Sequence, residues 1–206
     1  IHERLEDGTL PFHNIIALDT ALDTHERLFG SMANISAHTE FLAKQVYDRL
    51  SSLAHFNERK VCQIYQPHTS TYGDSHTQGP IIAFNLCNSR GEWVPKTEVE
   101  KLATVQDLQI RTGSVCNPGG TASSLGWTGP ELRRHYSAGL RCGDNHDVLG
   151  GRPTGILRVS IGATTNMKDI DSLLNFVEEF YMEKSPPIVA LDPLTEDNEV
   201  VAPHFY

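Results

Sequence analysis

Apolar side chains recur every three or four positions in two long stretches within the first quarter of the chain. This spacing places them along one side of a helix, so the pattern predicts helices over 11–29 and from about 34 to 53. Pro11 suits the start of the first helix, and Gly30 is typical of a helix end. The stripes consist of Ile15, Ile16, Leu18, Leu22 and Phe29, then Ile35, Leu42, Val46, Leu50 and Leu53.

The pattern then changes to the short apolar runs of β-strands. Runs rich in β-branched and aromatic residues, bounded by turn-forming residues, predict strands. They cover residues 61–65, 80–86, 108–115 and 154–161. The polar stretches 67–80 and 88–91 between them predict a loop and a turn.

Three further helices are expected, over 95–103, 128–138 and 166–182. The second of them opens with Thr128-Gly-Pro-Glu131, which matches a capping box with proline in the first turn. The third is amphipathic and closes the series of elements. The tail 184–206 is rich in proline and acids and has no period, which is typical of a linker or an extended arm.

Strands mixed with covering helices predict the α+β class, built on one small sheet. Residues 1–55 form a helical segment that we expect to pack on a larger domain outside this chain and to connect to it. Residues 56–183 would form the small α+β domain, and residues 184–206 the linker or tail.

Composition narrows the possible functions. The net charge of −9 over 206 residues disfavours sequence-independent binding to nucleic acid and binding to an anionic membrane surface. No apolar run has the length that spans a bilayer, and the opening residues do not resemble a signal peptide. The chain begins with Ile1 rather than Met, so we expect a fragment or a processed piece.

The chain has four cysteines, Cys62, Cys87, Cys116 and Cys142, without a Cys-x-x-Cys pair. That number is too small for a disulfide scaffold of this length and favours a reducing, cytoplasmic location. A metal site at His135, Cys142 and His146 is conceivable, but the spacing gives it little support, so we expect no metal. Packing in the core is the expected role of Cys62 and Cys87.

Cys116 stands apart, in Arg111-Thr-Gly-Ser-Val-Cys116-Asn-Pro-Gly-Gly120. The glycines permit unusual backbone conformations and Pro118 interrupts a strand, so the segment predicts a mobile loop that exposes the sulfur. A thiolate is the reactive form of cysteine, and the positive charge of Arg111 would favour it. The alternative is that Cys116 is a small buried apolar residue.

Two other positions have both a structural and a chemical interpretation. Arg158 lies mid-strand between Leu157 and Val159, where it either faces solvent or pairs with a carboxylate. Thr9 follows Gly8 just before the first helix, where it either caps that helix or, with backbone N–H groups, meets a phosphate.

Four segments together resemble a known family. They are Glu6 to Leu18, Phe29 to His38, Arg111 to Gly119 and Gly151 to Ser160. They are similar to the C-terminal part of the class V aminotransferase-like domain of the molybdenum cofactor sulfurase family, which acts as a cysteine desulfurase dependent on pyridoxal 5′-phosphate (PLP). The resemblance covers about residues 3–183. It implies the C-terminal small domain of a PLP-dependent fold-type I transferase, with a small, mostly antiparallel sheet and covering helices.

The resemblance also implies residue roles. Cys116 aligns with the catalytic cysteine that takes sulfur from L-cysteine and becomes a persulfide. Arg158 aligns with the arginine that binds the substrate carboxylate, and Arg111 is a second candidate for substrate binding. Thr9, with Gly8, aligns with the segment that reaches the PLP phosphate of the neighbouring subunit in a homodimer. The sulfur acceptor would be the molybdenum cofactor.

The family's PLP-binding lysine should precede Thr9, yet none of the six lysines stands in that context. The resemblance therefore implies that the N-terminal half of the same protein supplies it, and that this chain alone is inactive. Two alternatives stay open. One is a general cysteine desulfurase for iron–sulfur clusters or tRNA thiolation, and the other is a non-catalytic interaction domain derived from such an enzyme.

Overall fold

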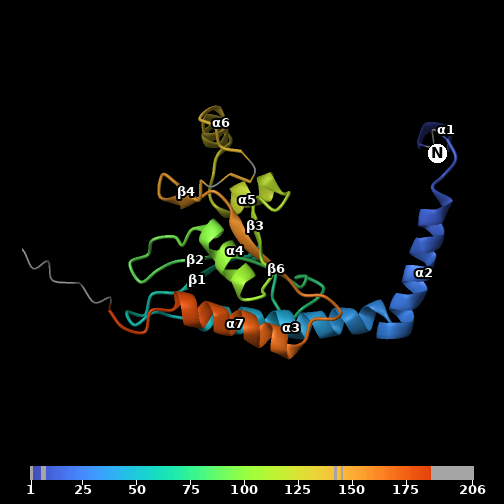
Figure 1. The fold of residues 1–206 in the computed structure, drawn as a ribbon, viewed down its shortest axis with the longest axis horizontal. Helices are drawn as coiled ribbons and strands as arrows, with labels where there is room; N and C mark the ends of the chain where they lie inside the picture. Colours follow the sequence, from blue (N-terminus) through green and yellow to red (C-terminus); the bar gives the residue numbers. More distant parts are fainter. Residues whose placement is uncertain (1, 6–7, 142, 145, 187–206) are drawn as a thin grey trace, which may run out of the picture.

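The computed structural model describes residues 2–5, 8–141, 143–144 and 146–186 (Figure 1). Its helices are α1 (His2–Leu5), α2 (Phe12–Phe29), α3 (Met32–Ser52), α4 (Lys96–Val105), α5 (Pro118–Ser124), α6 (Gly129–Ser137) and α7 (Met167–Tyr181). Its strands are β1 (Cys62–Tyr65), β2 (Ile81–Leu86), β3 (Arg111–Gly113), β4 (Val148–Leu149), β5 (Arg152–Pro153) and β6 (Ile156–Ser160).

Four of these strands form one antiparallel sheet in the order β1-β2-β6-β3. Strands β4 and β5 form a separate two-stranded hairpin. Alternate residues of a strand point to opposite faces, so the sheet has one apolar face and one polar face. The prediction of an α+β fold with a small antiparallel sheet is confirmed.

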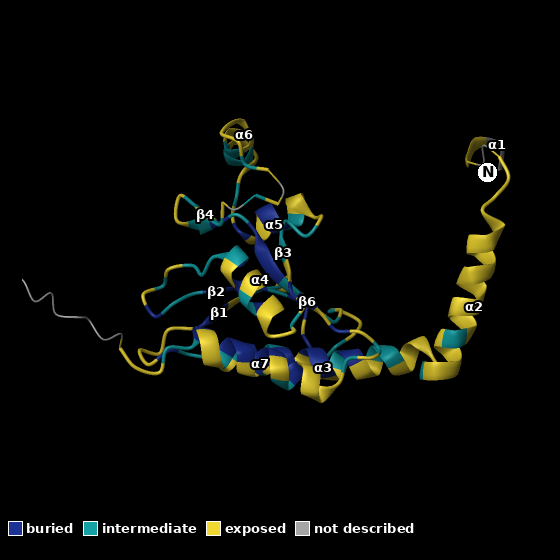
Figure 2. Cartoon of the chain, in the orientation of Figure 1, coloured by how far each residue is buried: buried dark blue, intermediate teal, exposed yellow. Residues whose placement is uncertain are grey.

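The apolar face of the sheet forms the core with α3, α4 and α7. Helices α3 and α7 lie side by side beneath the sheet, and the buried positions gather where they meet it (Figures 1 and 2). The largest fully buried side chains of the core are Leu42, Val46, Leu50, Val61, Ile82, Phe84, Leu86, Val99, Leu157 and Val177. Burial of these side chains is the main stabilising contribution to the fold.

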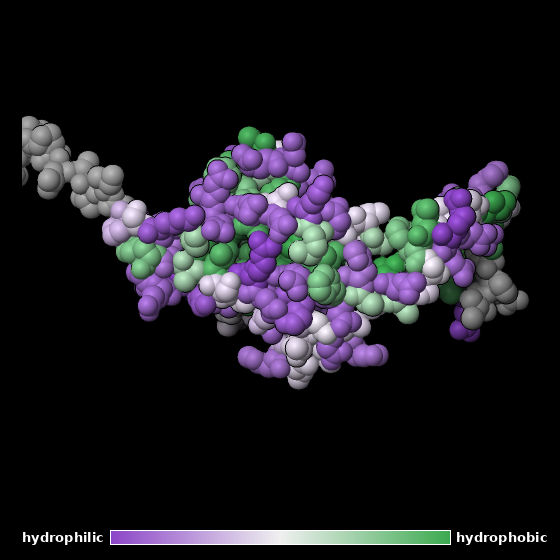
Figure 3. Space-filling model, turned by 90° about the horizontal axis from the view of Figure 1, so that it is seen from below, coloured by the Kyte–Doolittle hydropathy of each residue, from purple (hydrophilic) through white to green (hydrophobic). Residues whose placement is uncertain are grey.

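The first long helix, α2, does not pack on the sheet. It projects away from the body of the molecule, and none of its residues is buried (Figure 1). Its apolar side chains therefore stay exposed, and such side chains are visible from below along the projecting end (Figure 3). The predicted end at Gly30 is confirmed, with φ 80° and an N–H that donates to the Glu26 carbonyl.

The next helix, α3, begins at Met32 with the Ser31 side chain as its cap and joins the core through its second half. That half packs with the sheet, while the first half continues toward α2. The boundary expected at residue 55 stays a prediction.

The cap expected at Thr9 is wrong, because α2 starts at Phe12 with Pro11 in the N-cap position and no side-chain cap. A capping side chain acts from the N-cap position, and Thr9 lies two residues before it. The cap expected at Thr128 is confirmed, since its backbone N–H donates to Glu131 Oε2 over 2.8 Å.

Candidate functional site

Two arginines lie opposite each other on the polar face of the sheet. Arg111 of β3 pairs in register with Arg158 of β6, whose other neighbour is Ala83 of β2. Opposed residues of an antiparallel pair share a face, and like charges at such a position are destabilising. The alternation of β6 sends Leu157 and Val159 into the core and leaves Arg158 on the polar side.

The Arg158 side chain is half-buried and lacks a partner among the described residues. Its Nε atom is buried and forms no hydrogen bond there. A buried donor without an acceptor costs about 1–3 kcal/mol. An anion on this face would satisfy the donor and offset the repulsion from Arg111, and a carboxylate matches the planar guanidinium.

Cys116 lies at a tight turn rather than in a long loop. The Asn117 N–H donates to the Ser114 carbonyl over 2.8 Å, which closes the turn. Val115 and Cys116 both adopt left-handed backbone conformations, with φ 46° and 57°. A residue with a Cβ in this region stores about 1–2 kcal/mol of strain, and such strain is concentrated at functional sites.

The loop conformation expected at Gly119 and Gly120 is wrong, whereas the mobility of the Cys116 segment stays a prediction. Gly119 and Gly120 lie inside α5, which the sequence pattern did not predict. Asn117 caps this helix by accepting from the Gly120 N–H over 3.1 Å, and Pro118 occupies its first turn. Cap and proline together outweigh the poor helix propensity of glycine.

The sulfur of Cys116 is exposed and contacts Arg111. The guanidinium Nη2 of Arg111 lies 2.6 Å from Cys116 Sγ, in donor geometry. Cys62 differs, because burial raises the pKa of its thiol to about 12. Burial also raises the pKa of the half-buried Cys87 thiol. Of these three cysteines, Cys116 alone is exposed and hydrogen-bonded to a guanidinium; Cys142 lies outside the described residues.

The structure thus sets Arg111 in contact with Cys116 and in register with Arg158. It does not bring Gly8 and Thr9 to them, since the exposed start of α2 lies at the far end of the molecule from β3 (Figure 1). Gly8 and Thr9 could share a site with the arginines only if the two sets came from different copies of the chain, or if another part of the protein lay between them.

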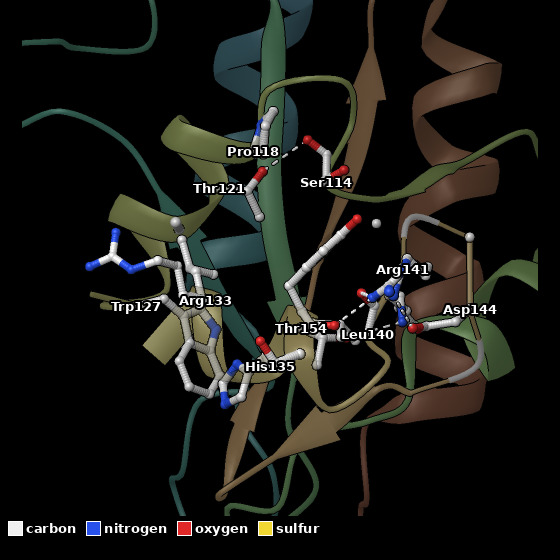
Figure 4. A pocket seen from close by; sticks show the side chains of 17 residues that line it. Ser114, Pro118, Thr121, Trp127, Arg133, His135, Leu140, Arg141, Asp144 and Thr154 are labelled. Carbon is white, nitrogen blue, oxygen red and sulfur yellow. Dashed lines mark hydrogen bonds between the residues drawn. The ribbon is translucent and has the colours of Figure 1, made fainter. Parts of the chain in front are cut away.

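A pocket that the sequence did not predict adjoins the Cys116 turn. Its volume is about 550 Å³, and it lies between α5, α6 and the segment around 140–144 (Figure 4). Ser114 and Pro118, on either side of the turn, form part of its wall. The capping box at Thr128 predicted helix α6. It could not predict the pocket beside that helix, because the pocket depends on how the chain folds back after Ala138.

A buried lysine borders the same pocket. Lys96 Nζ donates to Asp147 Oδ1 over 2.7 Å, to the His146 carbonyl over 3.1 Å and to Thr154 Oγ1 over 3.2 Å. All three of its donors are therefore in use. The other lysines are exposed.

No group of three or more His, Cys, Asp or Glu side chains within the described ranges could hold a metal ion. His135 packs its ring against Trp127, and His146 lies 3.3 Å from Asp144. The Cys142 part of the metal alternative lies outside the described residues. No described helix is both long and apolar enough to cross a membrane.

Known proteins are similar to this chain over most of its length. No family model matches the chain. It is 63% identical to the molybdenum cofactor sulfurase of Aspergillus niger over 198 residues, which is 96% of this chain and 24% of that protein. It is 60% identical to the molybdenum cofactor sulfurase of Neosartorya fischeri over its whole length, again 24% of that protein.

Solved structures show the same fold at low sequence identity. An apo cysteine desulfurase from Thermococcus onnurineus matches with a TM-score of 0.59 and 17% identity, over 87% of this chain and 33% of that one. The cysteine desulfurase CsdA from Escherichia coli, in an S-sulfonic acid form, matches with a TM-score of 0.52 and 19% identity, over 85% and 32%.

The chain spans about a quarter of the length of the curated relatives it matches. Its α+β fold is that of one part of the cysteine desulfurases. By its sequence, the chain is similar throughout nearly its whole length to one part of the molybdenum cofactor sulfurases.

Proposed function

We propose that this chain carries the sulfur-accepting half of a PLP-dependent L-cysteine desulfurase whose acceptor is the molybdenum cofactor. The observation that carries the proposal is the placement of Cys116 Sγ 2.6 Å from the Arg111 guanidinium, with Arg111 directly opposite Arg158. A nucleophilic sulfur and a carboxylate-binding cation are thereby held on one small surface.

Arg158 is the proposed anchor for the substrate. Its buried, unpartnered Nε offers a directed donor to the carboxylate of L-cysteine. The two carboxylate oxygens can accept two parallel N–H bonds from a guanidinium, which fixes orientation as well as charge. Arg111, across the strand pair, adds a second positive charge to the same face.

Cys116 is the proposed nucleophile. Its sulfur attacks the sulfur of L-cysteine, an S–S bond forms and the substrate C–S bond breaks. The electron pair of the broken bond goes to the substrate carbon, which takes up a proton. The products are alanine and a Cys116 persulfide, so atoms and electrons balance without another oxidant. Arg111 holds the sulfur at the exposed turn in the resting state.

PLP, when bound, would supply the electron sink that makes the substrate C–S bond labile. The lysine for it would come from the N-terminal half of the same protein, as the resemblance implies. Gly8 and Thr9 are proposed to meet the PLP phosphate of a neighbouring subunit in a homodimer; their exposure leaves them available for it. We also propose a cytoplasmic location, and a division of the chain into a helical segment (1–55), a small α+β domain (56–183) and a linker or tail (184–206).

The test uses the full-length protein that contains this segment, incubated with PLP and L-cysteine. We expect Cys116→Ala to abolish the persulfide on this segment and to lower alanine formation by at least about 100-fold, as for the loss of a covalent nucleophile. The matched control is Ser123→Ala, at an exposed position of α5. Alanine formation by Cys116→Ala at the parental rate would sink the assignment.

Arg158→Lys distinguishes substrate binding from the sulfur step. Lysine keeps the charge but loses the planar fork, so KM for L-cysteine should rise more than kcat falls. Sulfur delivery is then followed to the molybdenum cofactor, to an iron–sulfur scaffold and to tRNA. Delivery only to the last two would favour a general desulfurase, and a full-length protein that binds no PLP would favour a non-catalytic domain.

A further inference from the structure

The pocket under α6 has the lining of a small-molecule site. Its volume of about 550 Å³ falls within the range typical of ligand pockets. The walls are mostly apolar or aromatic and come from separate elements: Pro118 and Ala122 of α5, Leu132 and Tyr136 of α6, Trp127 and Leu140. Figure 4 shows side chains from these elements converging on one space.

The indole of Trp127 is held rigidly in this wall. Its Nε1 donates to the Pro153 carbonyl over 2.8 Å, and the Arg152 guanidinium stacks 3.8 Å from the centre of the ring. The ring of His135 meets it edge-on at 4.4 Å. A flat, fixed aromatic wall favours a flat ligand, because stacking then costs the protein little conformational entropy.

The rim of the pocket is positively charged, although the whole chain has a net charge of −9. Arg133 and Arg141 line opposite sides of it, and no carboxylate of the described residues forms an ion pair with either. The Arg141 guanidinium keeps its charge, although its Nη1 donates to the Tyr136 and Leu140 carbonyls and the group stacks on the Tyr136 ring. Asp144, the acidic residue of the lining, accepts from the backbone N–H groups of Arg141 and His146 and lies near the His146 ring. Unneutralised guanidinium groups at the mouth select for an anion.

We infer that this pocket binds a planar heterocycle that carries an anionic group such as a phosphate or carboxylate. The ring lies against Trp127 among the apolar walls, and the anion meets Arg133 and Arg141 at the rim. This site goes beyond the proposed sulfur chemistry and does not depend on it. Because Ser114 and Pro118 belong both to the wall and to the Cys116 turn, the ligand sits beside the sulfur-bearing segment.

The test uses guanosine 5′-monophosphate as the probe and Trp127 as the reporter. Quenching is measured on the full-length protein, and the part of it that Trp127→Phe removes reports on the pocket. We expect saturable quenching by the nucleotide, about tenfold weaker binding of guanosine, and no quenching by inorganic phosphate alone. Equal binding of nucleotide and nucleoside, or no saturable quenching, would overturn the inference.

Two neighbouring arginines provide a matched pair of variants. Arg133 lines the pocket, whereas Arg134 is an exposed residue of the same helix outside the lining. Arg133→Glu should weaken nucleotide binding by about tenfold or more, and Arg134→Glu should leave it unchanged within about twofold. Equal weakening by both variants would mean general charge attraction and would contradict the site.

Two further variants separate this site from folding and from the proposed function. Ala122→Met fills the pocket and should abolish quenching, with circular dichroism and thermal melting to confirm that the variant folds. Cys116→Ala should bind the nucleotide like the parent, because Cys116 does not line the pocket. Lost alanine formation with intact nucleotide binding in Cys116→Ala would support both proposals separately.

Discussion

Replacing Lys96 by Met tests the buried ion pair that joins α4 to the pocket wall. The side chains of Lys96 and Asp147 are only 9% and 12% exposed, and their charged atoms lie 2.7 Å apart. Methionine retains much of the apolar stem and removes the charge, so Asp147 keeps the Thr97 hydroxyl as a donor but loses its cation. An unpaired, nearly buried charge costs about 3–5 kcal/mol.

The matched control is Lys44→Met, which removes the lysine of an exposed lysine–aspartate ion pair. Lys44 and Asp48 are 2.6 Å apart, but their side chains are 50% and 47% exposed, so Lys44→Met should cost less than about 1 kcal/mol. For a chain of this size, the loss expected for Lys96→Met corresponds to a fall in Tm of about 10 °C, which calorimetry measures. Urea unfolding measures the loss of free energy of unfolding directly. If both variants lose the same stability, burial is not what gives the Lys96 pair its importance.

Three other outcomes follow from the same structure. Iodoacetamide should modify Cys116 well before Cys62, whose thiol pKa burial raises to about 12, as peptide mass mapping would show; equal labelling would contradict the assigned exposure. Hydrogen bonds from the Ser89 side chain and backbone lower the pKa of Glu183, so its contribution to stability is present above its unfolded pKa and lost as pH falls through the folded one. Glu183→Gln should therefore destabilise the chain at neutral pH and differ less from the parent in acid; a constant difference across that range would refute the linkage. Phe84→Ala should cost about 3–5 kcal/mol in urea unfolding, because Phe84 is fully buried at the centre of the sheet, and a loss below 1 kcal/mol would place it outside the core.

The elements with a strong local signal were predictable from the sequence. The capping box at Thr128 located the start of α6, and the apolar alternation around Leu157 and Val159 located β6 together with its polar residue, Arg158. These signals depend on neighbouring residues alone, so they do not require knowledge of the fold.

What the sequence could not supply depends on contacts between distant segments. Helix α5 contains Gly119 and Gly120 and looks like a loop until the Asn117 cap is taken into account. The register that sets Arg111 opposite Arg158 joins residues far apart in the chain. The apolar stripe of α2 predicted a helix correctly, but periodicity carries no information about whether a stripe is covered.

Strand β3 sits at the margin of the sheet and is fastened to it by three residue pairs with β6. An edge strand this short can separate from the sheet by local unfolding, which costs a small fraction of the free energy that unfolds the whole domain. Amide protons of Thr112 and Gly113 should then exchange with solvent far sooner than those of β2. The sulfur at the end of this strand would swing outward toward a recipient while the sheet behind it stays intact.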